Sequence, residues 1–187
     1  HSSLGNTASP QVQRFQQIEA IYAGAGDDLL DATISLDAPS LDIALYGEEG
    51  NDILWGGTKD DVIYGGNGDD VIIGGAGADT LFGGKGNDTF KFTSTCGSDQ
   101  LADFNLIEGD AIHLLYMNSQ IGDSTMSEAS KQSWLENTLT INTDNNTITW
   151  SLDESSDVVL SFSNQRITQE GLWYLLYDDV ISFHEII

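Results

Sequence analysis

The chain has 187 residues, with 30 acidic and only 6 basic side chains, so its formal net charge at pH 7 is −24. This charge excludes nucleic acid as a partner, because nucleic-acid affinity depends on Lys and Arg that neutralise phosphates. The chain is nevertheless 40% hydrophobic, which argues against disorder, so a compact state must overcome carboxylate repulsion by binding cations.

Residues 1–22 form a lead-in that we expect to act as an N-terminal cap, and residues 11–23 fit either a first strand or a helical turn. Residues 23–31, AGAGDDLLD, then carry the spacing of a glycine-rich turn followed by a short strand. Residues 32–46 contain no glycine and break this spacing. They predict a strand, an irregular turn between Asp37 and Asp42, and a second strand.

Residues 47–91 repeat every nine residues, five times without a gap: GEEGNDILW, GGTKDDVIY, GGNGDDVII, GGAGADTLF and GGKGNDTFK. The template is Gly-Gly-x-Gly-x-Asp-x-U-x, where U is a large apolar residue. Position eight is held by Leu54, Ile63, Ile72, Leu81 and Phe90. This nonapeptide is typical of a calcium-binding parallel β-helix.

The repeat brings the position-six aspartates together in a predictable way. Glycines let the backbone turn tightly at positive φ, and two turns with two short strands make an 18-residue coil. Coils stack at about 4.8 Å, which pairs Asp52 with Asp70, Asp70 with Asp88, and Asp61 with Asp79. Stacked carboxylates repel without a cation, which disfavours the alternative of ordinary ion-free turns. Hard oxygen ligands select Ca²⁺, and we expect at least three ions.

Several positions near the array carry weaker signals. Asp28 is expected to pair its turn with the turn of Asp52. Asp37 or Asp42 either completes a site with Asp61 or is a loop acid, and Asp99 with Asp103 can close a last site with Asp79. Lys59 and Glu48 replace template glycines; we expect backbone strain at Lys59, and the carboxylate of Glu48 can add an oxygen.

Residues 92–187 lack the glycine repeat and carry most of the bulky aromatic residues. Residues 92–117 predict strand, turn and strand, and residues 127–137 fit a short helix with Ser127 as its N-cap. Residues 138–150 predict a β-hairpin, residues 157–162 a strand, and residues 171–183 a strand or a helix. The predicted fold is therefore mainly all-β: a parallel β-roll over residues 23–91 with a β-rich C-terminal cap over residues 92–187.

No catalytic motif was found. The sequence has no Gly-x-Ser-x-Gly elbow and no His-Glu-x-x-His helix, and His113 and His184 lie alone in strand-like segments. The single cysteine, Cys96, excludes an internal disulfide. No run of 18 apolar residues is present, so no membrane insertion is expected, and no signal peptide is visible.

The repeats resemble the RTX (repeats-in-toxin) region of bacterial proteins exported by type I secretion. Residues 18–31 (IEAIYAGAGDDLLD) resemble the entry to this region in large surface adhesins. Residues 97–115 (GSDQLADFNLIEGDAIHLL) and the final segment LWYLLYDDVISFHEII resemble their C-terminal secretion-target region. The resemblance implies export of an unfolded chain, folding on extracellular calcium, and a secreted or cell-surface location.

The resemblance also implies a ligand set. Each ion takes the carbonyls of positions two and four and the aspartate of one turn, and the carbonyls of positions one and three and the aspartate of the next turn on that edge. The candidate turn and ligand residues are Gly24, Gly26, Asp28, Gly47, Glu48, Glu49, Gly50, Asp52, Gly56, Gly57, Thr58, Lys59, Asp61, Gly65, Gly66, Asn67, Gly68, Asp70, Gly74, Gly75, Ala76, Gly77, Asp79, Gly83, Lys85, Asp88 and Asp99.

Three functions are compatible with the sequence. The first is a monomeric, calcium-dependent folding and export module of a large adhesin, whose parent protein meets a host or biofilm receptor. The second is the same module in a secreted exoenzyme or haemolysin. The third is a carbohydrate- or peptide-binding module, which exposed Trp134, Trp150 or Trp173 beside a pocket would favour.

Overall fold

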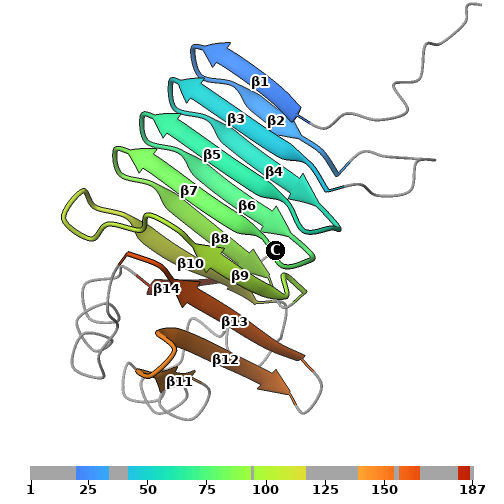
Figure 1. Ribbon diagram of the computed structural model, residues 1–187, viewed down its shortest axis with the longest axis vertical. Coiled ribbons are helices and arrows are strands. Elements are labelled where there is room, and N and C mark those ends of the chain that lie inside the picture. The colour runs from blue at the N-terminus through green and yellow to red at the C-terminus, as the bar shows by residue number, and fades with distance from the viewer. Residues whose placement is uncertain are drawn as a thin grey trace, which may run out of the picture.

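The computed structural model describes residues 20–33, 42–93, 95–116, 139–153, 156–164 and 181–185. These residues form two sheets that face each other, and the strands of both sheets are stacked along a common axis. The N-terminal strands lie at one end (Figure 1). The first sheet runs in the spatial order β1 (Ala20–Ala25), β3 (Ala44–Glu49), β5 (Val62–Asn67), β7 (Thr80–Lys85), β9 (Ser98–Leu101), β13 (Ser156–Phe162), β12 (Thr147–Asp153) and β11 (Leu139–Asn142). The second sheet runs β14 (Ile181–Glu185), β10 (Ala111–Tyr116), β8 (Thr89–Thr93), β6 (Val71–Gly75), β4 (Ile53–Gly57) and β2 (Leu29–Asp31).

The chain alternates between the two sheets, so each coil contains one strand of each. Within the five repeats, neighbouring strands of a sheet are parallel and in register, for example Leu45 with Ile63 and Ile63 with Leu81. Equivalent turns are then 18 residues apart. The predicted parallel β-roll is therefore confirmed.

The position-eight residues fill the space between the sheets. Leu54, Ile63, Ile72, Leu81 and Phe90 are all fully buried, while residues on either side of them in each strand are less buried. This alternation follows from the two-residue period of a strand. Each coil contributes two large apolar side chains, and burial of this column provides the hydrophobic stabilisation of the roll.

The first coil is longer than the others. Strands β1 and β2 pair in parallel with β3 and β4, but the turn of Asp28 precedes the turn of Asp52 by 24 residues. The outlying turn expected at residues 23–31 thus stacks on the array. Residues 34–41, which include Asp37, lie outside the described residues.

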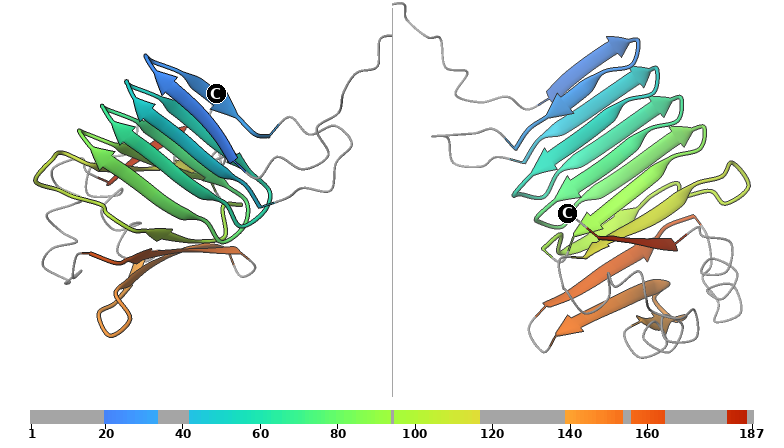
Figure 2. Two further views of the ribbon diagram at one scale, coloured as in Figure 1. Left: turned by 45° about the horizontal axis from the view of Figure 1, so that its top comes forward. Right: turned by 180° about the vertical axis from the view of Figure 1, so that it is seen from behind.

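Both sheets continue beyond the last nonapeptide. Strand β9 adds to β7 and β10 adds to β8, in parallel, and then β13 and β14 pair in parallel with β9 and β10. The hairpin expected at residues 138–150 is formed by β11 and β12, whose antiparallel strands extend the first sheet beyond β13 (Figure 2). The helix expected at residues 127–137 lies outside the described residues.

Aromatic side chains fill the core between the last repeat and the C-terminal strands. Phe104 is fully buried, with its ring centroid 6.0 Å from Phe90 and 5.7 Å from Phe162. Phe162 belongs to β13, so these contacts join the last repeat to the added strands.

A column of aromatic rings lies on the outer face of the first sheet. Tyr22, Tyr46, Tyr64 and Phe82 occupy equivalent places in β1, β3, β5 and β7, with successive ring centroids 4.5, 4.8 and 4.5 Å apart and nearly parallel planes. The rings stack face to face because the in-register strands repeat at a similar spacing.

In the part of the chain that the structure describes, no helix has the length and apolarity needed to cross a membrane.

Candidate cation sites along the two edges

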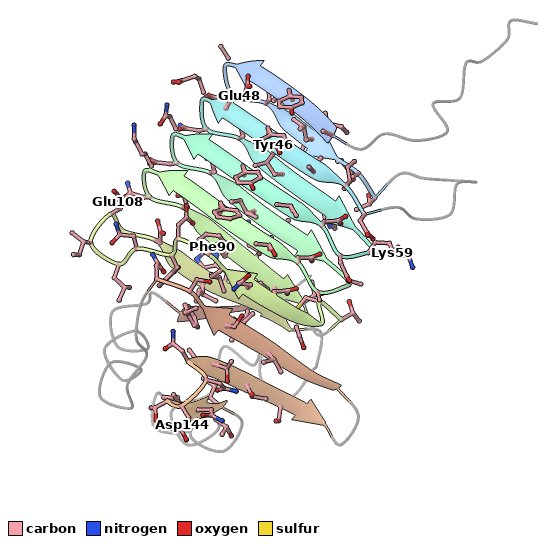
Figure 3. All side chains as sticks on the ribbon, in the orientation of Figure 1. Tyr46, Glu48, Lys59, Phe90, Glu108 and Asp144 are labelled. Carbon is pink, nitrogen blue, oxygen red and sulfur yellow. The ribbon has the colours of Figure 1, made fainter. Side chains whose placement is uncertain are left out.

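The position-six aspartates form two columns, one along each edge of the roll. Turns that follow strands of the first sheet make the Asp70 edge, and turns that follow strands of the second sheet make the Asp79 edge. Figure 3 shows Glu48 on the Asp70 edge and Lys59 on the opposite edge. The Asp70 edge contains Asp28, Asp52, Asp70, Asp88 and Asp110, and the Asp79 edge contains Asp61, Asp79 and Asp99.

Each aspartate in a column is tied to the turn before it. The N–H of Asp52 donates to Oδ1 of Asp70 at 2.8 Å, and the N–H of Asp70 donates to Oδ1 of Asp88 at 3.0 Å. On the other edge, the N–H of Asp61 donates to Oδ1 of Asp79 at 2.9 Å. The three pairs expected from the repeat are thus brought together. The same bond joins Asp28 to Asp52 and Asp79 to Asp99.

The second carboxylate oxygen of most of these residues has no protein partner. Oδ2 of Asp52, Asp70, Asp79, Asp88 and Asp99 is buried without a hydrogen bond, and each of these residues is at most 2% exposed. A buried charged oxygen without a partner is strongly unfavourable. These five atoms therefore require a counter-charge that the described side chains do not supply.

The backbone around these oxygens is shaped by glycine. A Cβ at Gly66 or Gly68, both at positive φ, would overlap the carbonyl oxygen of Glu48 or Gly50 in the turn before. A Cβ at Gly47 would overlap both Oδ2 of Asp52 and the carbonyl oxygen of Gly65. Carbonyl oxygens and an unpartnered carboxylate oxygen therefore crowd the same place between two turns.

Burial makes these carboxylates hard to ionise. Desolvation raises the pKa of Asp70 and Asp79 to about 6, and that of Asp88 and Asp99 to about 7. Neighbouring carboxylates raise each pKa further, while the N–H bonds to Oδ1 act in the opposite direction. A bound cation would reverse this balance, because an opposite charge favours the ionised form.

Within the described ranges, no three Asp, Glu, His or Cys side chains gather into a metal centre. A cation between two turns would therefore take two carboxylates and several backbone carbonyls. An all-oxygen set of this kind suits a hard cation such as Ca²⁺ and does not suit zinc or copper.

Comparison of the sequence with known protein families agrees with this arrangement. Residues 20–33, 46–81 and 55–90 match the RTX calcium-binding nonapeptide repeat. The repeats of this chain are RTX calcium-binding repeats. They fold here into an RTX β-roll, and its aspartate columns are the candidate calcium sites.

Two further comparisons concern whole proteins. No curated protein matches the chain significantly. Among solved structures, the chain is similar to the extracellular lipase LipA from Serratia marcescens, with 25% sequence identity and a TM-score of 0.35. That match covers 81% of this chain and 19% of the lipase chain, so the chain spans less than a fifth of the lipase's length.

The strain expected at Lys59 is not found, and this expectation was wrong. Among the described residues other than glycine, only Glu48, at 76°, and Asn146, at 58°, have positive φ. The turn of Lys59 differs from the other RTX turns, because the N–H of Gly57 donates to Oδ2 of Asp61 at 2.7 Å. A Cβ at Gly57 would meet only ordinary van der Waals neighbours, whereas one at Gly56 would overlap the carbonyl oxygen of Gly74, so this turn needs glycine at its first position and not at its second.

Two acids flanking the array, Asp103 and Asp42, are placed outside the aspartate columns. Asp103 does not join Asp79: its carboxylate accepts the N–H groups of Gly83 and Gly84, on the opposite edge. It does so because β9 ends at Leu101 and leaves the end of β7 without a strand partner. Asp42 is exposed, and Ile43, not Asp42, donates its N–H to Oδ1 of Asp61.

Sequence reasoning missed a second ladder at position five of the repeat. The N–H of Asn51 donates to Asp27, that of Asp69 to Asn51, and that of Asn87 to Asp69, each at 2.8–2.9 Å. Because Asp and Asn alternate in this exposed column, a coil that carries Asn lies between two coils that carry a carboxylate. That alternation was the available signal.

Asp110 was also missed. It is 3% exposed, and its Oδ1 accepts the N–H of Asp88 at 3.0 Å, as in the repeats. The available signal was the triplet Asp-x-U, which persists at Asp99 to Leu101 and at Asp110 to Ile112 after the Gly-Gly pairs have ended.

The other chemically reactive candidates have no catalytic arrangement in the described part. Cys96 is 2% exposed and lies beside Asp99. Burial, and then the Asp99 charge, raise the pKa of its thiol far above the ordinary value, which makes the thiol unreactive. His113 lies in β10 and is half-buried. The side chains of His184 and Trp150 are not described, and Trp134 and Trp173 lie outside the described residues.

Proposed function

We propose that this RTX β-roll is a calcium-dependent folding module whose ions lie between stacked turns. The observation that carries the proposal is the set of five buried, unpartnered Oδ2 atoms on the two edges. For Asp52 and Asp70, a carbonyl oxygen of the next turn lies close to this oxygen, because a Cβ at Gly47 or Gly65 would overlap both atoms. A hard cation in each place would neutralise the carboxylates and complete a shell of six to eight oxygens.

The RTX resemblance implies which carbonyls act as ligands at each pair of stacked aspartates. The ion between Asp52 and Asp70 would take the carbonyls of Glu48, Gly50, Gly65 and Asn67. The ion between Asp70 and Asp88 would take those of Gly66, Gly68, Gly83 and Lys85. The ion between Asp61 and Asp79 would take those of Gly57, Lys59, Gly74 and Ala76. The turns of Asp28 and Asp99 would add ions with Asp52 and Asp79.

Calcium binding and folding are coupled in this proposal. A net charge of −24 opposes compaction, and the stacked carboxylates exist only in the folded roll, so the free energy of ion binding becomes free energy of folding. Extracellular sites of this kind have Kd values of roughly 10⁻⁴ to 10⁻³ M. The chain would therefore stay unfolded at low cytosolic calcium.

The direct test is circular dichroism of the whole chain with EDTA, with Ca²⁺ and with Mg²⁺. We expect the β signal to be lost in EDTA and restored cooperatively by Ca²⁺ but not by Mg²⁺, which demands a small octahedral cage. An unchanged spectrum after chelation would refute the proposal. Ion counting on the refolded protein gives the stoichiometry, for which we expect at least three.

We further propose that residues 92–187 cap the roll and serve type I secretion of a large adhesin, with residues 1–22 as the N-terminal lead-in. The pairing of β13 and β14 with the last coil supports a capping role, since solenoids need a terminal cap. A chain ending at Lys91 should then need far more calcium to fold than the whole chain, while one beginning at Tyr46 should keep most of the response. Equal midpoints for the whole chain and the chain ending at Lys91 would exclude the cap.

The export role has its own test. The whole chain, fused behind a soluble passenger, should reach the medium of cells that carry a type I secretion system for adhesins. Deletion of residues 92–187 should retain the passenger inside the cells. Export that is unaffected by the deletion would count against a secretion-target role.

A further inference from the structure

The loop between β9 and β10, residues 102–110, stands where a repeat would place its next turn on the Asp70 edge. Asp110 follows Asp88 by 22 residues instead of 18, and the loop carries none of the Gly-Gly pairs of the repeats. In Figure 3 its Glu108 lies on the same edge as Glu48. The loop nevertheless keeps the ladder bond, because the N–H of Asp88 donates to Oδ1 of Asp110.

Asp88 presents an unpartnered oxygen at this loop. The residue is 1% exposed, and its Oδ2 has no hydrogen-bond partner. It lies beside Gly83, where a Cβ would overlap it. Asp70 has the same arrangement one coil earlier, where Oδ2 lies beside Gly65 together with the carbonyl oxygen of Gly83. By this equivalence, Oδ2 of Asp88 faces the space between its own turn and the loop.

The carboxylate of Asp110 is held in place by the loop itself. Its Oδ2 accepts the N–H of Asn105 at 2.7 Å, much as Oδ2 of Asp61 accepts the N–H of Gly57. Asn105 also accepts, through its carbonyl, the N–H groups of Glu108 and Asp110. The loop is therefore a closed turn that fixes a carboxylate without the Gly-Gly pair of the repeats, and its one glycine, Gly109, has a φ of 103°.

Asp103 has a different task. Both of its carboxylate oxygens accept N–H groups, from Gly83 at 2.8 Å and from Gly84 at 3.1 Å. These bonds replace the strand pairing that ends with β9, so Asp103 ties the loop to β7, whereas Asp110 continues the aspartate column through its bond to Asp88. Of the five unpartnered oxygens, Oδ2 of Asp88 is the one that the stacking places next to this loop.

We propose that the 102–110 loop closes a further divalent-cation site between Asp88 and Asp110, outside the nonapeptide repeats. The carboxylates of these two residues supply oxygens, together with the carbonyls of Gly84 and Gly86. Both glycines have the positive φ that turns the equivalent carbonyls of Gly66 and Gly68 toward the next coil. Carbonyls of the loop or water complete the shell, and Ca²⁺ is the cation that fits such a set. The proposal rests on the proposed calcium-binding function of the repeats.

The decisive test is the position of the ions in crystals of the unmodified whole chain grown with Ca²⁺. Anomalous scattering of calcium at long wavelength should give a peak between Asp88 and Asp110, in addition to peaks between Asp52 and Asp70 and between Asp70 and Asp88. Peaks at the repeats without one between Asp88 and Asp110 would overturn this site and leave the proposed function standing. Absence of any peak would overturn both.

Ion counting provides an independent measurement. Asp110→Asn should bind one ion fewer than the unmodified chain at saturating Ca²⁺, measured by equilibrium dialysis. Glu108→Gln is the matched control, because it removes the same charge from an exposed residue of the same loop and should keep the full count. Asp103→Asn should also keep it. A full count in Asp110→Asn would overturn the site.

Discussion

Asp70 is the middle one of the three repeat aspartates on its edge, with a complete repeat turn on each side. Its Oδ1 accepts the N–H of Asp52, its own N–H donates to Asp88, and its Oδ2 is one of the unpartnered oxygens. It would therefore contribute to two ions, one on each side. Replacement of this single side chain should weaken both.

We expect Asp70→Asn to raise the calcium concentration at half-folding by roughly tenfold or more, since loss of even an outer-shell partner usually weakens metal binding 10- to 100-fold. The measurement is a calcium titration followed by circular dichroism. Asp144→Asn, in the exposed turn between β11 and β12, removes the same charge away from the columns. Similar midpoints for the two variants would contradict the stacked-turn assignment.

Glu48 carries backbone strain in a place where the repeat normally has glycine. Its φ of 76° is costly for a residue with a Cβ. The adjacent Glu49 is also exposed but has no positive φ, and its Oε1 accepts the side-chain N–H of Asn67 at 2.7 Å. The two glutamates therefore differ in φ and in this hydrogen bond, and both differences favour glycine at position 48 over glycine at position 49.

We expect Glu48→Gly to be more stable than Glu49→Gly by roughly 1–2 kcal/mol, the usual cost of the left-handed conformation. Both variants gain the same freedom in the unfolded chain, so this term cancels in the comparison. Urea unfolding at saturating Ca²⁺ measures the difference. Equal losses of stability would show that Glu48 carries no strain.

At the scale of elements, the sequence predicted the strands of the repeats because each contains one obligatory inward residue. It did not predict that β9 and β10 continue both sheets, because the glycine signal stops at Gly86. The triplets ending in Leu101 and Ile112 still place a carboxylate on an edge and an apolar residue inside. Strand stacking thus depends on the aspartate and the inward residue, and glycine is needed only where turns approach closely.

The aromatic column on the first sheet should add stability beyond its area. Tyr46 stacks on two rings, Tyr22 and Tyr64, and such pairs contribute about 0.5–1.5 kcal/mol each. Tyr46→Leu should therefore lower the free energy of unfolding at saturating Ca²⁺ by about 1–3 kcal/mol and abolish most of the tyrosine signal in near-ultraviolet circular dichroism. Trp55→Leu, at the same repeat position but opposite Ile73 in the second sheet, should cost less. A larger loss at Trp55 would refute the role of the column.

At the scale of the whole molecule, protons should partly replace calcium. The raised pKa of Asp88, about 7 against an ordinary 3.8, means that the calcium-free roll binds protons more tightly than the unfolded chain does. The stabilisation is complete below the unfolded value of 3.8 and is lost as pH rises through about 7. In EDTA, the β signal should therefore be stronger at pH 5 than at pH 7.5. Identical spectra at both values would contradict this linkage.

The sequence predicted the overall architecture only in the segment where the nine-residue repeat continues without interruption. The five repeats alone predicted the 18-residue coil, the column of inward apolar residues and the aspartates on both edges. The spacer at residues 32–46 and the loop at residues 102–110 change the coil length to 24 and 22 residues, and nothing in their composition indicates how the extra residues are accommodated. The role of Asp103 as an acceptor for backbone N–H groups of β7 could not be predicted either, because it depends on where β9 ends. Packing determines that end.

The 18-residue register limits how such an array can grow by duplication. Loss or gain of one nonapeptide would transfer every strand on its N-terminal side to the opposite sheet. Tyr46 would then leave its column and stand where Trp55 stands, and the turn of Asp52 would move to the Asp79 edge. A duplication or deletion of two nonapeptides leaves every neighbour unchanged. Lengthening of this protein in evolution is therefore expected to proceed in pairs of repeats, although the visible unit of its sequence is nine residues.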